Sequence, residues 1–189
     1  MAQRDFWLKN VRLSFPDLWE ATQAQGKGKF AYRAVLLVDS SDPQKAMVDK
    51  LIKEMATEEW KAKTDKILDE VLTDKRACCW MDGNKKDYDG YENTYALSAL
   101  RYQEKGRPTI VDRDRSPLTE KDGKPYAGCY VNAKLQLWTQ DNDSGKGVRC
   151  ELLGIQFAKD GDAFAGGTKA ADADEFEDLS AGADADAMC

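Results

Sequence analysis

The sequence contains no histidine, and this absence removes whole classes of chemistry. Histidine is the commonest metal ligand and the commonest general base in proteins. Catalytic sites of the Ser-His-Asp, Cys-His and HExxH types are therefore excluded. Catalysis by carboxylates is the one enzymatic mechanism left open, and we expect no metal and no cofactor.

The chain also lacks cysteine motifs and long apolar segments. Its cysteines are Cys78, Cys79, Cys129, Cys150 and Cys189, and no two of them have CxxC spacing. Neither a disulfide framework nor a zinc finger is indicated, and a reducing compartment fits. No run of about 18 apolar residues occurs, and residues 1–7 lack the apolar core of a signal peptide. We expect a protein that stays in the cytoplasm and does not enter a membrane.

Charge is present in quantity but is distributed unevenly. The net charge is -6, yet residues 160–189 alone contain nine acidic residues and one basic residue, Lys169. The remaining 159 residues carry 27 basic and 25 acidic side chains. A slightly basic body is therefore followed by a strongly acidic tail, which is a pattern of proteins with charged partners.

The hydrophobic pattern predicts a mainly β body with a helical insertion. Alternating or apolar runs predict strands over 6–13, 30–38, 91–102, 109–111, 128–140 and 148–159, and Pro16-Asp17 is expected to end the first of them. Asp42 and Pro43 mark the start of an insertion over residues 42–75, with one long helix or two helices broken near 57–64. An OB-fold-like small barrel over residues 1–160 is the leading architecture. Residues 161–189 are too poor in apolar side chains to fold alone and predict a disordered tail.

The strand over 128–140 is the most informative segment for function. Because strand side chains alternate between two faces, Cys129, Val131 and Leu135 fall on a core face. Tyr130, Lys134 and Trp138 fall on the other. Proteins that bind single-stranded nucleic acid need this mixture, because bases stack on flat rings while cations follow the phosphates.

Further basic and aromatic residues are interleaved between Arg76 and Arg115, which is a second indication of nucleic-acid binding. Tyr91, Tyr95 and Arg101 share one strand parity and Tyr102 has the other, so these side chains cannot all face one way. The complete set of candidate DNA-binding residues is Arg33, Trp80, Lys85, Lys86, Tyr91, Tyr95, Arg101, Tyr102, Tyr130, Lys134, Trp138 and Arg149.

The tail combines carboxylates with two apolar side chains. Its candidate regulatory or partner-binding residues are Asp172, Asp174, Glu175, Phe176, Glu177, Asp178 and Leu179. Such a segment can compete with DNA for a basic groove or bind a partner protein. A tail that only keeps the protein in solution is the simpler alternative.

Two other functions remain open at this point. Asp112 and Asp114 share strand parity and could hold a divalent metal, as in a nuclease or related recombination enzyme, although arginines interrupt them and no third carboxylate is evident. An acidic protein could also mimic DNA and inhibit a DNA-binding partner. Cleavage that depends on magnesium would distinguish the first alternative from a non-catalytic binder.

Several motifs occur in an order that resembles a known family. They are Arg107–Arg113, Gly128–Ala133, Trp138–Asn142 with Gly145–Gly147, and Leu153–Gly161, followed by Gly166-Gly167 and an Ala-Asp-Glu-Phe segment. This series is similar to the single-stranded-DNA-binding proteins of tailed bacteriophages, with the densest match over residues 107–176.

The resemblance implies an OB-fold, binding of single-stranded DNA with little sequence preference, and no enzymatic activity. It further implies a role in phage DNA replication or recombination in the cytoplasm of a bacterial host. An acidic tail that competes with DNA and recruits replication or recombination proteins would complete the family pattern.

Overall fold

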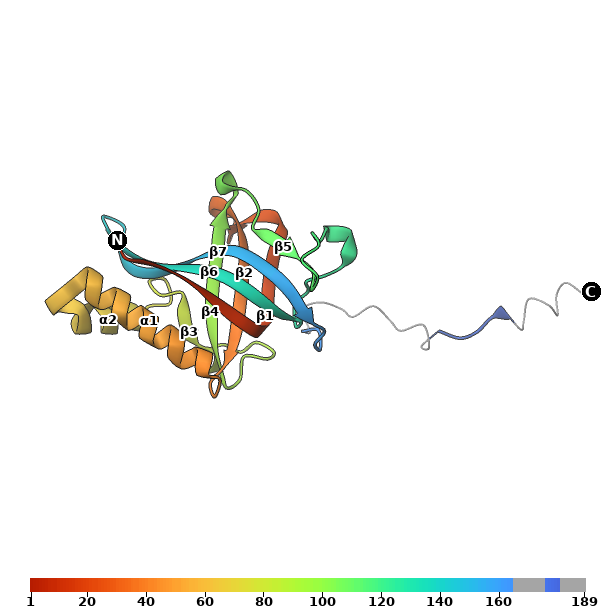
Figure 1. Cartoon of the computed structure of the whole chain (residues 1–189), viewed down its shortest axis with the longest axis horizontal. Helices are drawn as coiled ribbons and strands as arrows, with labels where there is room; N and C mark the ends of the chain where they lie inside the picture. The colour runs from red at the N-terminus through yellow and green to blue at the C-terminus, as the bar shows by residue number, and fades with distance from the viewer. Residues whose placement is uncertain (165–175, 181–189) are drawn as a thin grey trace, which may run out of the picture.

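The computed structural model describes residues 1–164 and 176–180 (Figure 1). Its helices and strands, in chain order, are β1 (Gln3–Ala24), β2 (Lys27–Asp39), α1 (Pro43–Trp60), α2 (Thr64–Thr73), β3 (Trp80–Asp82), β4 (Thr94–Tyr102), β5 (Thr109–Val111), β6 (Tyr130–Asn142) and β7 (Gly145–Lys159). Each predicted strand and both parts of the predicted helical insertion are present. The short strand β3 was not predicted.

Five of the strands close into a barrel. Antiparallel pairs join β1 to β2, β2 to β4, β1 to β6 and β6 to β7, and a parallel contact between Leu100 on β4 and Glu151 on β7 completes the ring. The order around the barrel, β1-β2-β4-β7-β6, is the Greek-key order of an OB-fold. The prediction of a mainly β, OB-like barrel with one helical insertion is confirmed.

Strand β1 is longer than the sequence pattern indicated. It continues through Pro16 to Ala24, so the expectation that Pro16-Asp17 ends the strand was wrong. The reason is a bulge, because the register with β2 shifts between Ser14 and Asp17. Proline is tolerated at a bulge, where a ladder hydrogen bond is already missing.

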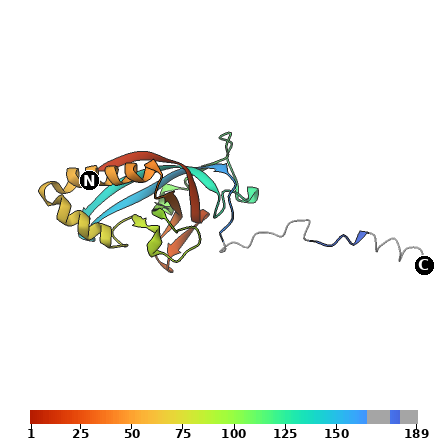
Figure 2. The same cartoon turned by 90° about the horizontal axis from the view of Figure 1, so that it is seen from below.

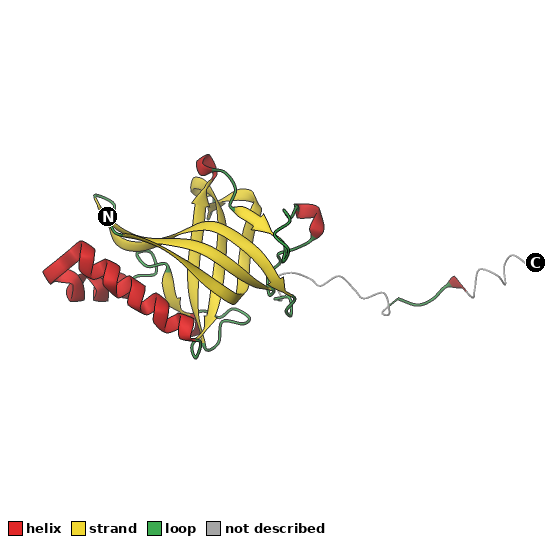
Figure 3. Cartoon of the chain, viewed as in Figure 1, coloured by secondary structure: helices red, strands yellow, loops and turns green. Residues whose placement is uncertain are grey.

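The insertion consists of two helices. The Asp42 side chain accepts a hydrogen bond from the backbone N–H of Gln44, and Pro43 occupies the first turn of α1. A short 3₁₀ segment, Lys61–Lys63, separates α1 from α2, where the break between two helices was expected. Figures 2 and 3 show both helices at one end of the barrel, beside the long twisted ends of β1, β6 and β7. Val48, Ile52 and Met55 are buried there against the barrel core.

A second, smaller apolar cluster lies outside the barrel. It consists of Leu37, Tyr91, Ala96 and Phe164. Gly90 is required beside it, because a Cβ at that position would come within 2.3 Å of the Phe164 ring. Phe164 is thus packed against the barrel, four residues beyond the predicted end of the body at residue 160.

Among the described helices, none is long and apolar enough to cross a membrane.

Candidate nucleic-acid interface

A groove of about 780 Å³ crosses the outer surface where β4, β7 and β6 run side by side. Side chains that line it include Ser98, Leu100 and Tyr102 from β4, Arg149 and Glu151 from β7, Gln136, Trp138 and Gln140 from β6, and Lys75 and Lys105 from the connecting segments. Three predicted DNA-binding residues, Tyr102, Trp138 and Arg149, therefore lie in one groove.

Strand β6 places its side chains as the alternation predicted. Val131, Ala133, Leu135 and Leu137 are fully buried, whereas Trp138 points outward and remains partly exposed. An indole at the surface of a groove has a free face on which a base can stack.

The charge in the groove is mainly positive. Lys75, Lys105 and Arg149 line it, and Glu151 is the one carboxylate among its described lining residues. Glu151 is itself neutralised, since its carboxylate lies 2.7 Å from Arg101 Nη1 and 2.9 Å from Lys105 Nζ. A phosphate in the groove would therefore meet excess positive charge.

Arg149 is held in position by its neighbours. Its Nε donates to Gln140 Oε1 at 3.0 Å, and its Nη1 donates to the backbone carbonyl of Arg76. Arg101, in contrast, does not line the groove but contacts two residues that do, Glu151 and Lys105. Its guanidinium donates to Glu151 and to the carbonyls of Lys105 and Gly106, which ties β4 to β7.

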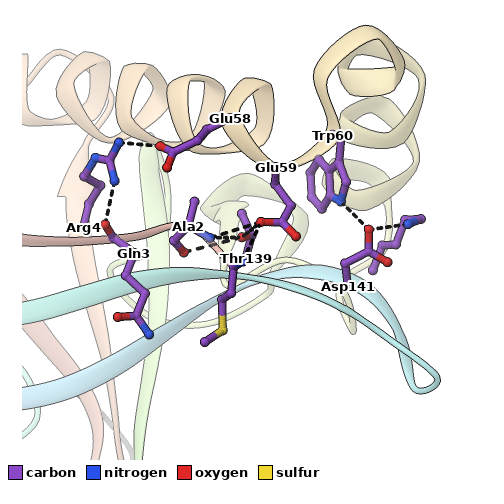
Figure 4. A network of polar contacts seen from close by, with 10 residues as sticks. Ala2, Gln3, Arg4, Glu58, Glu59, Trp60, Thr139 and Asp141 are labelled. Carbon is purple, nitrogen blue, oxygen red and sulfur yellow. Dashed lines mark hydrogen bonds and ion pairs between the residues drawn. The ribbon is translucent and has the colours of Figure 1, made fainter.

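Helix α1 fixes the end of β6 that carries the groove (Figure 4). Glu59 Oε2 accepts hydrogen bonds from Ala2 N at 3.1 Å and Thr139 Oγ1 at 3.2 Å. Trp60 Nε1 donates to Asp141 Oδ2 at 3.1 Å. The N-terminal ammonium, 3.1 Å from Glu59, is the largest cause that holds the pKa of this carboxyl below its usual range. These contacts preorganise the segment of β6 around Trp138.

Three predicted aromatic residues have packing partners within the fold. Trp80 is 3% exposed, and its Nε1 donates to Asp49 at 2.9 Å. Tyr91 is also 3% exposed and belongs to the outer apolar cluster. The Tyr95 ring packs on the Trp80 ring, and Lys45 Nζ lies over the Tyr95 ring. These residues stabilise the fold, and we leave them out of the proposed interface.

The other predicted residues lie outside the groove. Lys159 covers the ring of Tyr130, 4.6 Å from its centroid. Lys134 is exposed on the β1–β6 face, directly opposite Trp7. Arg33 lies on β2, while Lys85 and Lys86 line a separate hollow between the helices and β3.

The set of candidate residues chosen from sequence omits three exposed cations in or beside the groove. Lys75 and Lys105 line it, and Lys29 Nζ lies 5.4 Å from the ring centroid of Tyr102. Lys29 follows the tight turn that joins β1 to β2. In an OB-fold this turn is the loop between the first two strands, which together with the loop between the last two strands borders the usual binding face.

The two carboxylates considered for metal catalysis have structural partners. Asp112 Oδ2 lies 2.9 Å from Lys124 Nζ, whose hydrogen bond is the largest cause lowering the pKa of Asp112. Asp114 accepts hydrogen bonds from the side chain and backbone of Ser116, which lower its pKa. Both groups close the loop that follows β5.

Comparison with known proteins gives one family. The family described as "Enterobacter phage Enc34, ssDNA-binding protein" matches residues 5–188. Putative protein p50 of Acyrthosiphon pisum secondary endosymbiont phage 1 is 45% identical over 177 residues, which is 92% of each chain.

Solved structures share the fold at lower identity. The single-stranded DNA-binding protein from bacteriophage Enc34 in complex with ssDNA has a TM-score of 0.70 and 23% identity, over 85% of this chain and 89% of that one. Gp2.5 of bacteriophage T7, a single-stranded DNA binding protein, has a TM-score of 0.54 and 19% identity, over 94% of this chain and 97% of that one.

Proposed function

Because this chain belongs to the family of the ssDNA-binding protein of Enterobacter phage Enc34, we propose that it binds single-stranded DNA without catalysing a reaction. The observation that carries the proposal is the groove itself. It joins two aromatic side chains, the exposed Tyr102 and the partly exposed Trp138, to three cations on the outer surface of an OB-like barrel.

The physical basis of binding is stacking combined with charge. Rings of Tyr102 and Trp138 accept any base, because every base has a flat face. Lys75, Lys105 and Arg149 neutralise phosphates and release counterions. The combination favours single strands, whose bases are free to stack, and it gives little sequence preference.

The composition of the acidic tail favours a role in regulating DNA binding. We propose that it competes with DNA for the groove and recruits replication or recombination proteins once DNA displaces it. Asp172, Asp174 and Glu175 lie outside the described residues. Phe176 and Leu179 are described and are more than 70% exposed, so both side chains are accessible to a partner.

A titration of fluorescent oligonucleotides with the full-length protein tests the proposal. We expect saturable binding to oligothymidylate and to mixed single strands with similar affinity, weaker binding to duplex DNA, and no requirement for magnesium. Strand cleavage that starts when magnesium is added would replace the proposal with an enzymatic function. Failure of every single strand to bind, with or without the tail, would leave a DNA mimic.

A further inference from the structure

Phe15 occupies a backbone conformation that aromatic residues avoid. Its φ is +44°, in the left-handed region, at the bulge of β1. The other described non-glycine residues with positive φ are Asn10, Gln25, Lys61, Asn93 and Arg115, so Phe15 is the one aromatic among them. Asn10 shows that β1 elsewhere uses asparagine, a residue that tolerates this conformation. Strain of this kind is retained most often where a side chain has a function.

The bulge holds the Phe15 side chain in solvent. Phe15 is 54% exposed and Tyr88 is 51% exposed, and their ring centroids are 5.0 Å apart with the planes at 72°. We call these two rings the aromatic platform. They rest on Tyr91, whose ring is buried, 5.3 Å from that of Tyr88, and whose hydroxyl donates to Ser14 Oγ at 3.0 Å. The two exposed rings therefore pack on a buried, hydrogen-bonded tyrosine.

The aromatic platform and the groove lie beside different parts of the same strand, β2. Ser14, next to Phe15, pairs with Val35, and Tyr102 at the rim of the groove pairs with Ala31. The two sites are thus four residues of β2 apart, or about 13 Å at the rise of a β-strand. About four nucleotides span this distance at the 3.4 Å spacing of stacked bases, which is within the site size of one OB-fold.

A cation lies between the two sites. Arg33 is on β2 between Ala31 and Val35. Within residues 1–164 and 176–180, its Nε is a buried nitrogen without a hydrogen-bond partner, and its Nη2 donates to the Thr22 carbonyl at 3.5 Å, which is a long contact. The loop that carries Tyr88 lines a small hollow with three carboxylates, Asp87, Asp89 and Glu92, and one cation, Lys86, so that side of the ring repels phosphate on balance. A strand would therefore approach the platform along β2, past Arg33.

We propose that Phe15 and Tyr88 form a second stacking site for the same DNA strand, with Arg33 holding a phosphate between this site and the groove. The inference rests on the proposed function and extends it, because it assigns the path of the strand along β2. The positive φ of Phe15 is then the structural cost of presenting a ring to a base.

The test compares Phe15→Asn with the wild-type full-length chain on an oligothymidylate of about twelve nucleotides, a length within the site sizes of OB-folds. Asparagine accepts the positive φ, so the midpoint of thermal unfolding should stay the same or rise. Affinity should fall about fivefold or more, since one stacked base is lost. Phe15→Tyr and Tyr88→Phe keep the rings and should bind as the wild type does.

Trp138→Ala is the matched variant in the groove. If the wild type binds and Trp138→Ala weakens binding while Phe15→Asn does not, the second stacking site is wrong and the groove stands. A fall in affinity of Phe15→Asn that is accompanied by a lower unfolding midpoint would assign the ring to packing and also overturn the inference. If the wild type binds no single strand, the proposed function itself fails.

Discussion

Trp138 on β6 lies directly opposite Arg149 on β7 in the antiparallel ladder, so an indole ring and a guanidinium leave the barrel surface side by side. A nucleotide has the matching composition, with a flat base next to a charged phosphate. Gln140 and the Arg76 carbonyl hold the guanidinium from the other side. The pair is therefore the smallest unit of the groove that can bind both parts of a nucleotide.

Substitution of the ring in this pair should weaken DNA binding and leave the fold intact. We expect Trp138→Ala to cost about 1–3 kcal/mol of binding free energy, the value of one stacked base. The free energy of unfolding should change little, because the ring is outside the core. Fluorescence anisotropy gives the affinity, and urea unfolding gives the stability.

Trp80→Ala is the contrasting substitution. The Trp80 ring is packed in the core, so its removal should lower the free energy of unfolding by about 3–5 kcal/mol. Affinity per folded molecule should be unchanged. Loss of affinity in folded Trp80→Ala, with normal affinity in Trp138→Ala, would mean that the two tryptophans have been assigned to the opposite roles.

The charge of Arg149 should be visible in the salt dependence of binding. Log K for single-stranded DNA falls with log salt concentration with a slope of about -0.7 for each phosphate contact. Arg149→Gln should make this slope shallower by about one contact. Lys121→Gln removes an exposed cation from the 3₁₀ turn Glu120–Asp122, away from the groove, and serves as the control. Equal slopes in all three proteins would remove Arg149 from the interface.

Removal of the tail should raise affinity for all DNA. Residues 160–189 carry nine acidic side chains and one basic side chain, and a tethered anion acts at a high local concentration, of the order of mM for a short linker. Truncation from Ala170 should increase duplex binding most, because duplex bases cannot add stacking to outcompete the tail. The difference should shrink as salt is added. Equal affinities of the two forms at low salt would leave the tail without a competing role.

Stability should fall at alkaline pH through Cys129. Burial raises the pKa of this thiol to about 11, from an ordinary value of 9.0. The raised pKa means that the folded state favours the protonated thiol. Its contribution to stability is therefore complete below pH 9 and is lost as the pH rises toward 11. Cys129→Ala should show a smaller loss of unfolding free energy over this interval in urea titrations. Parallel pH profiles for the two proteins would contradict this account.

The parts of the interface that could be predicted from sequence are those on long regular strands. Burial along β6 alternates for eleven residues, from Tyr130 to Gln140, so the outward position of Trp138 and the inward position of Leu137 follow from a period of two. The capping of α1 by Asp42 was similarly local, because the side chain and its backbone partner are two residues apart.

The parts that could not be predicted depend on contacts between distant segments. Strand β3 is three residues long, too short to show a period, and Trp80 is buried because β3 pairs with β4 and lies near α1. The position of Phe15 depends on a bulge that arises from pairing with β2. The local sequence alone favoured an end of the strand at Pro16, because it does not show this pairing.

The pairing of β1 with β6 also determines when the barrel can form during synthesis. Gln3 pairs with Trp138, and Phe6 pairs with Leu135. The N-terminal half of β1 therefore cannot pair with β6 until about 130 further residues have been synthesised. Contacts of such long sequence separation make folding slow, in the range of milliseconds to seconds for β-barrels. A nascent chain that ends before β6 has only β2 beside β1, and its inward face remains open to solvent. Chain termination in this region therefore yields an aggregation-prone fragment in place of a smaller functional barrel.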